Sequence, residues 1–310
     1  MLPRAAIFNG GGIYVEPNAK LTRNTTSVSE NTRAQNGDGL FVDGILVVTG
    51  GQISGNLASF LGGGTYCSGT AGAATLADAN LNCNIAQVSG GGVYGGGGTL
   101  IISGGAFLNN TAELDGGGLY FASASVINAT TFIDNTARTG GGVGNYGNMN
   151  VSNSVLHGNT AVLFGGGQSD INAAALLTMS STTVSGNATC NLLAARCQGG
   201  GIFNRRGAMR LVNSTISSKQ GVVGGVAISF GSVSARNTII AGNLAVEGGT
   251  SIDVEGVSYS SGNNLIGNNF ESTFFSAAGD VTRTRAAPVD RRRATTRQLR
   301  RYNAHAVAVF

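Results

Sequence analysis

The chain has few charges, few prolines and no long apolar run. Of its 310 residues, 11% are charged, three are proline, two are histidine and none is tryptophan, whereas about 25% of residues are charged in a typical soluble domain. No apolar stretch approaches the ~20 residues of a membrane-spanning helix, so we expect no membrane span. The low charge fits a stack of strands, because a charge at the same position in adjacent strands would repel its own copy.

The chain instead has 51 glycines, many of them in runs that recur. The runs begin at Gly10, Gly62, Gly90, Gly116, Gly140, Gly165, Gly199, Gly224 and Gly248, with a degraded copy around Gly37 and Gly39. From Gly62 onward the steps between these starts are 28, 26, 24, 25, 34, 25 and 24 residues. A period in the twenties is typical of solenoids, in which each repeat packs only against its neighbours.

A second motif, an apolar residue followed three positions later by Asn, recurs between the glycine runs, as in F-L-N-N-T-A at 107–112. Its Asn residues are Asn31, Asn56, Asn84, Asn110, Asn135, Asn159, Asn187 and Asn243. One further copy, at 216–221, has Lys219 at this position. We expect the Asn side chains to stack as a ladder of amide hydrogen bonds. We also expect Asn at one corner and Gly at another to supply left-handed backbone angles.

A third apolar run, such as Leu100-Ile101-Ile102, lies between the two motifs. Each repeat therefore has three short strands, and the glycine content and the β-branched residues disfavour helix. Three strands wound in the same sense in every repeat predict an all-β parallel β-helix over residues 1–269. It would have about ten coils of ~25 residues, stacked roughly 4.8 Å apart.

The pairing of F-x-x-N-T-A with a glycine run and an apolar pair, as in residues 107–120 and 132–143, resembles the repeats of the chlamydial polymorphic outer membrane proteins. The resemblance covers roughly residues 10–250, with Gly at the third position of the run where that family has Ala. It implies a right-handed β-helix passenger that is secreted by an autotransporter route and is used in adhesion. The phrase at 260–269 also resembles the end of a broader group of bacterial secreted β-helix proteins.

The first residues, M-L-P-R-A-A-I-F-N-G, have no basic segment followed by an apolar stretch, so they are not a signal peptide. They enter a coil without the cap that a solenoid end needs. We therefore expect the chain to be a fragment or to start from a misassigned start codon.

The other end, residues 270–310, is expected to be a non-repeat tail. From Arg283 to Arg301 it holds eight of the 19 basic residues and one acidic residue, Asp290, which leaves 11 basic against 14 acidic residues elsewhere. The net positive charge therefore belongs to the tail, and we expect no nucleic-acid binding by the coils. The tail is disordered or frame-shifted, with a role at an anionic surface as the alternative.

The four cysteines fall in the two longest repeats. Cys67 and Cys83 belong to one, and Cys190 and Cys197 to the other. We predict two local disulfides that close loops, which implies an oxidising compartment. Free buried thiols are the alternative. Zinc is not expected, because no histidine lies near either pair.

Acidic residues that could catalyse a reaction do not align. Asp134 and Glu30 share a position but lie about four coils apart, and Asp115 precedes a glycine run. The strongest acidic candidates are Asp253 and Glu255, with Glu247 nearby. We assign no catalytic, cofactor-binding or metal-binding residue.

Three other groups of residues have a functional and a structural interpretation. The basic cluster Arg205, Arg206 and Arg210 binds an anionic sugar or is a solvated loop. His157 is a surface residue, and His305 lies in the tail. A column formed by Thr111, Thr136 and Thr160, with Thr32 in the same position, is a short threonine array of the kind that binds ice.

Together these observations predict a monomeric, non-enzymatic, structural or adhesin-like β-helix passenger. It would be extracellular or at the cell surface, associated with the outer membrane. Its partner would be a host or matrix surface, or a polysaccharide. The alternative is a carbohydrate-active β-helix enzyme, a lyase or hydrolase of acidic polysaccharide.

Overall fold

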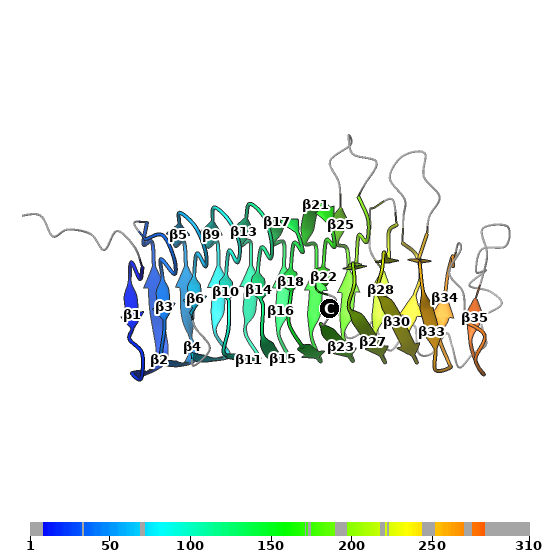
Figure 1. The fold of residues 1–310 in the computed structure, drawn as a ribbon, viewed down its shortest axis with the longest axis horizontal. Coiled ribbons are helices and arrows are strands. Elements are labelled where there is room, and N and C mark those ends of the chain that lie inside the picture. Colours follow the sequence, from blue (N-terminus) through cyan, green and yellow to red (C-terminus); the bar gives the residue numbers. More distant parts are fainter. Residues whose placement is uncertain are drawn as a thin grey trace, which may run out of the picture.

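The computed structural model describes residues 9–282 except 33, 69–71, 171, 173–174, 190–196, 218–220, 222, 244–251 and 270–274. Within these residues every regular element is a β-strand, and all paired strands are parallel. The strands wind into a rod of stacked coils (Figure 1). The predicted fold, a right-handed parallel β-helix, is confirmed. Among the described residues no helix is long and apolar enough to cross a membrane.

Sheet 1 takes the strand that follows each glycine run. Its ten strands, in spatial order, are β1 (Ile13–Val15), β3 (Leu40–Val42), β6 (Thr65–Cys67), β10 (Val93–Gly95), β14 (Leu119–Phe121), β18 (Val143–Asn145), β22 (Gln168–Asp170), β26 (Ile202–Asn204), β29 (Val226–Ile228) and β32 (Val254–Glu255). The register aligns equivalent repeat positions, so that Val93 pairs with Leu119 and Tyr94 with Tyr120.

Sheet 2 has nineteen strands and is bent. Its first half contains β7 (Ala73–Ala77), β11 (Thr99–Ser103), β15 (Ala124–Asn128), β19 (Met149–Ser152), β23 (Leu176–Ser180), β27 (Ala208–Val212), β30 (Ser232–Arg236) and β33 (Ser258–Ser260). Its second half contains β8 (Asn80–Asn82), β12 (Ala106–Leu108), β16 (Thr131–Ile133), β20 (Val155–His157), β24 (Thr183–Ser185), β28 (Thr215–Ser217), β31 (Ile239–Ile240), β34 (Leu265–Ile266) and β35 (Val281–Thr282). The long strands β2 (Lys20–Ser29) and β4 (Ile45–Ser54) cross both halves.

Sheet 3 is the shortest, with β5 (Leu57–Ala58), β9 (Ile85–Ala86), β13 (Thr111–Ala112), β17 (Thr136–Thr139), β21 (Thr160–Phe164) and β25 (Ala188–Thr189). The three predicted strands per coil therefore correspond to three sheets, but sheet 2 contributes two strands to most coils. The reason is a residue with positive φ between its halves, such as Ala129 at 51° or Asn153 at 50°, which turns the chain without leaving the sheet.

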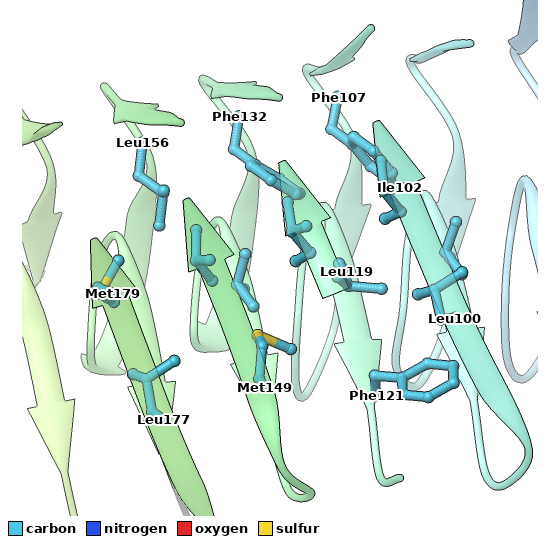
Figure 2. Packing of buried hydrophobic residues seen from close by; sticks show 14 of the residues in the cluster. Leu100, Ile102, Phe107, Leu119, Phe121, Phe132, Met149, Leu156, Leu177 and Met179 are labelled. Carbon is cyan, nitrogen blue, oxygen red and sulfur yellow. The ribbon is translucent and has the colours of Figure 1, made fainter. Parts of the chain in front are cut away.

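The core is the interior of the coil. Strand alternation sends Leu100 and Ile102 of β11 inward, together with Phe107 of β12, and all three are at most 1% exposed. Equivalent residues of successive coils stack along the rod, as the rings of Phe107 and Phe132 do at 4.6 Å (Figure 2). The apolar pair after each glycine run is divided between the two sides, with Leu119 inside and Tyr120 outside.

The first two glycines of a run are required for different reasons. Gly116 has a φ of +66°, the left-handed conformation predicted for this corner. At Gly117, an added Cβ would lie 2.4 Å from the carbonyl oxygens of Gly141 and Thr136. The corner therefore brings neighbouring backbones into a contact that leaves no room for a side chain.

The stack continues beyond the boundary predicted at residue 269. Strand β35, Val281–Thr282, pairs in parallel with β34, although both sequence motifs have disappeared there. Backbone pairing needs an extended chain but not the repeat's particular residues. The predicted Arg-rich tail from residue 283 lies outside the described residues.

Candidate functional site

The predicted Asn ladder forms the corner between sheets 2 and 3. The Nδ2 atom of each Asn donates to Oδ1 of the next, at 2.8 to 3.0 Å, along Asn31, Asn56, Asn84, Asn110, Asn135, Asn159 and Asn187. From Asn56 onward these residues are fully buried. From Asn56 to Asn187 each Nδ2 also donates to a backbone carbonyl of the preceding coil, as from Asn135 to Phe107 at 2.9 Å. Lys219, which replaces the next Asn, lies outside the described residues.

The conformational part of the ladder prediction is wrong. The residue with positive φ is the one before the ladder Asn, such as Asn109 at 54° or Asp134 at 53°. The bend therefore belongs to the preceding residue. The side chain of the ladder Asn is left to turn inward and meet its copies.

The last ladder residue, Asn243, donates to a carboxylate instead. Its N and Nδ2 atoms lie 2.9 and 2.6 Å from Oδ1 of Asp253, whose Oδ2 accepts from the backbone N of Asn268 at 2.6 Å. Burial raises the pKa of Asp253, and these hydrogen bonds oppose that rise. The acidic candidate Asp253 therefore acts as an internal acceptor that terminates the ladder. Glu255 is half-buried in β32, and Glu247 lies outside the described residues.

A second ladder at the bend of sheet 2 was not predicted. The backbone N of Thr130 donates to Oγ of Ser154 at 3.1 Å, and that of Thr182 to Oγ of Ser214 at 3.3 Å. Farther along, Asn264 donates to Asp280 at 2.9 Å, so a carboxylate also ends this ladder. The sequence signal is a Ser or Thr directly after a residue that tolerates positive φ, as in Asn153-Ser154 or Asn213-Ser214.

The predicted bridge between Cys67 and Cys83 is wrong, because both are free thiols. Strand alternation places Cys67 inside at the end of β6, whereas Cys83 occupies the exposed bend before Asn84. Burial raises the pKa of Cys67 to about 12. In the second predicted bridge, Cys197 is fully buried and Cys190 lies outside the described residues, so that bridge stays a prediction.

Other predicted positions are on the surface. His157 is exposed, with Nδ1 3.0 Å from Oγ of Ser185 in the next coil. Thr111, Thr136 and Thr160 stack in register, but Ile85 and Ala188 flank this column. Asp134 is exposed and occupies the bend.

The outer face of sheet 1 carries a column of stacked aromatic rings, which we call the aromatic column. Its rings are the outward residues of five successive strands, and adjacent centroids lie 4.9 to 5.3 Å apart along Tyr14, Phe41, Tyr66, Tyr94 and Tyr120. Adjacent planes differ by at most 16°. The spacing of the rings is that of the strands, so the register of the sheet alone produces the stack.

The aromatic column stops at the next two coils. Its position is occupied by Gly144 in β18 and Ser169 in β22, before Phe203 restores a ring in β26. A cleft of about 300 Å³ lies at this interruption, lined by Leu114, Asp115, Arg138, Thr139, Leu163, Phe164, Ser169, Phe203 and Arg205. We call it the sheet 1 cleft.

Opposite charges face one another in the sheet 1 cleft. Burial raises the pKa of Asp115, and the nearby Arg138 guanidinium partly offsets this. Burial raises the pKa values of Tyr94 and Tyr120, and the Asp115 carboxylate adds to this rise, so the cleft adjoins the end of the aromatic column. Arg205, from the predicted basic cluster, reaches the same cleft, whereas Arg210 is exposed on β27 of sheet 2. The predicted basic cluster is therefore divided between two faces.

Polar residues also enter the core beneath the sheet 1 cleft. Gln168 and Asp170 point inward from β22 and are fully buried. Oδ1 of Asp170 lies 3.4 Å from Nδ2 of Asn145, and burial raises the pKa of Asp170 to about 7. Sequence reasoning missed this group, because Q-S-D follows a glycine run where other coils have an apolar pair.

Within the described part of the chain, no three His, Cys, Asp or Glu side chains come together as a metal site. Comparison of the chain with the models of protein families, with curated proteins and with solved structures finds no match.

Proposed function

We propose that this chain is a non-enzymatic β-helix passenger that displays the outer face of sheet 1 as a binding surface for polysaccharide or for a host or matrix surface. The observation that carries the proposal is the aromatic column together with the cleft beside it. The stacked rings cover one another's faces and Phe41 is buried, but Tyr14 is exposed and Tyr66, Tyr94 and Tyr120 are half-buried. Their edges and hydroxyl groups, repeated at one strand spacing, offer an extended, rigid surface that suits a polymer better than a small molecule.

The proposal includes location and assembly. The chain would act as a monomer outside the cell or at the cell surface, as its resemblance to polymorphic outer membrane protein repeats implies. What supports this is the repeat pattern itself, since the FxxN and glycine-run motifs lie at the two corners that the fold uses.

The test is binding by the purified full chain to immobilised glycans, matrix proteins and cultured cells. Replacing Tyr94 and Tyr120 together by Ala should reduce retention several-fold, because two adjacent rings are lost. The matched control is Phe230→Ala, which removes an aromatic side chain that is 79% exposed and lies outside the column. Retention that is unchanged in the double variant, or absent in the unmodified chain, would reject the proposal.

A second candidate, a carbohydrate-active enzyme, is favoured by one observation. Asp115 has a raised pKa in a cleft that also contains Arg138, and a carboxyl group with a raised pKa suits a general acid or base. A glycosidase usually needs a second carboxylate across the bond. Incubation with acidic polysaccharides distinguishes the candidates, since an enzyme releases unsaturated or reducing ends and a passenger does not.

A further inference from the structure

The sheet 1 cleft is built by the interruption of the aromatic column and by a β-bulge. Tyr120 leans over the next coil, so that a Cβ added at Gly144 would lie 3.1 Å from its ring. The opening therefore lies over Ser169. Between β17 and β21 the register shifts by one residue, since Ala137 pairs with Ala161 but Thr139 with Phe164. Such bulges redirect side chains, and here Leu163 and Phe164 line the opening.

One wall of the sheet 1 cleft is a rigid aromatic face. Phe164 is half-buried and stacks on the buried ring of Phe203, with centroids 4.5 Å apart and planes inclined by 19°. Phe203 belongs to a second apolar cluster with Val223, Ala227 and Ile252, against which Phe164 packs. A preformed flat apolar wall with a few polar groups around it is the usual composition of a ligand site.

Two polar groups of the cleft, Arg205 and Ser169, lack hydrogen-bond partners among the residues that the structure describes. Arg205 is exposed, and its guanidinium makes no hydrogen bond or ion pair with any residue that the structure describes. Oγ of Ser169 is buried and has no hydrogen-bond partner there either. A buried hydroxyl without a partner is costly, and a ligand hydroxyl that reached it would remove that cost.

Charge decides the class of ligand. Two guanidinium groups, Arg138 and Arg205, face one carboxylate, Asp115, so the cleft has a net positive charge. Guanidinium groups bind carboxylate and sulfate in a bidentate manner. Asp115 and Ser169 accept hydrogen bonds from hydroxyl groups. An anionic ring that also carries hydroxyl groups and an apolar face matches all three features.

We propose that the sheet 1 cleft binds an anionic sugar residue of a polysaccharide. Its apolar face packs against Phe164, its carboxylate or sulfate lies between Arg138 and Arg205, and its hydroxyl groups meet Ser169 and Asp115. The volume of about 300 Å³ is at the low end of small-molecule sites, which span ~300–1,000 Å³, so the cleft holds one or two sugar units. This inference rests on the proposed function and names the ligand for one part of its surface.

The test is calorimetric titration of the full chain with four probes. They are a short oligogalacturonate, the same oligosaccharide with its carboxyl groups reduced, a sulfated galactan oligosaccharide without uronate, and inorganic sulfate. We expect binding of the first or the third, which tells carboxylate from sulfate, and at least tenfold weaker binding of the reduced oligosaccharide. Arg205→Ala should weaken binding roughly tenfold, as loss of one charged hydrogen bond predicts, and Phe164→Ala by a similar factor.

Arg210→Ala is the matched control, because Arg210 is exposed on another sheet and should leave binding unchanged. Equal binding of the reduced oligosaccharide, unchanged binding by Arg205→Ala, or sulfate binding as tight as the sugars would overturn the inference. If glycans or cells still retain the chain while Arg205→Ala and Phe164→Ala have no effect, the proposed function stands and this inference fails. Accumulation of unsaturated ends would instead reject the non-enzymatic function.

Discussion

The Asn ladder and the aromatic column repeat at the same strand spacing, yet they differ in how much variation they accept. From Asn56 to Asn187 every coil keeps the same buried amide. Over the same coils the outward position of sheet 1 changes from Tyr120 to Gly144 and Ser169. Each ladder amide is both donor and acceptor for its neighbours, so one replacement leaves two partners unsatisfied. Replacement of an outward ring removes only stacking contacts. The outward position can therefore vary, and binding can select the residue found there.

The largest difference should appear when the Asn ladder is broken in its middle. Asn135→Ala removes the acceptor of Asn110 and the donor to Asn159, and it leaves the Phe107 carbonyl without a partner. We expect the free energy of unfolding to fall by about 3–5 kcal/mol, measured by denaturant unfolding. Asn150→Ala, on the exposed face of β19, is the control and should change it by less than about 0.5 kcal/mol. Equal losses of stability in the two variants would mean that the ladder amides do not stabilise the corner between sheets 2 and 3.

The glycine corner should be nearly as intolerant. Gly117→Ala places a Cβ 2.4 Å from two backbone oxygens, so adjacent coils must separate, and we expect a loss of about 3 kcal/mol. The comparison is Gly96→Ala, where the nearest atom is 3.7 Å away on the Tyr94 ring. Thermal unfolding of both variants measures the difference, and a fully stable Gly117→Ala protein would contradict the close packing of the coils.

The buried carboxyl group of Asp170 in β22 should make the stability of the protein depend on pH. Burial raises the pKa of Asp170 to about 7 from 3.8, so between about pH 4 and 7 the unfolded chain releases a proton that the folded chain keeps. Stability should therefore fall as the pH rises through this window. Asp170→Asn should stabilise the protein by about 2–3 kcal/mol at pH 8 and have little effect at pH 4. Asp134→Asn, at an exposed bend, is the control. If Asp170→Asn left the dependence of stability on pH unchanged, the Asp170 carboxyl group would not be its cause.

Removal of one ring from the aromatic column should have a smaller effect on stability. Tyr94 stacks on Tyr66 and Tyr120 at 5.3 and 5.1 Å, and each aromatic pair adds about 0.5–1.5 kcal/mol. We expect Tyr94→Ala to cost roughly 1–2 kcal/mol in denaturant unfolding. A loss as large as that of Asn135→Ala would mean that the column is a structural element and would weaken its functional interpretation.

The two free thiols differ in their expected reactivity, and a comparison of their labelling does not depend on a change in stability. Cys67 points inward and has a pKa raised to about 12, whereas Cys83 is exposed. Because the thiolate is the reactive form, an alkylating reagent should modify Cys83 in the native chain and Cys67 only after unfolding. Mass spectrometry of the labelled peptides measures this. Equal labelling rates in the native state would show that residue 67 is not held in the core.

The period of the glycine runs and the Asn motif by themselves determined the fold, the alignment of equivalent residues and the Asn ladder. A solenoid repeats local interactions, so a regular spacing in sequence becomes a regular spacing in the structure. Only the tertiary structure decided whether each residue faces the interior of the coil or its outer surface. It placed Cys67 inside and Cys83 outside, and it made Asp253 the end of a ladder. It also brought Asp115, Arg138 and Arg205 into one cleft. These residues come from different coils, and the bulge and the small residues that open the cleft carry no periodic signal.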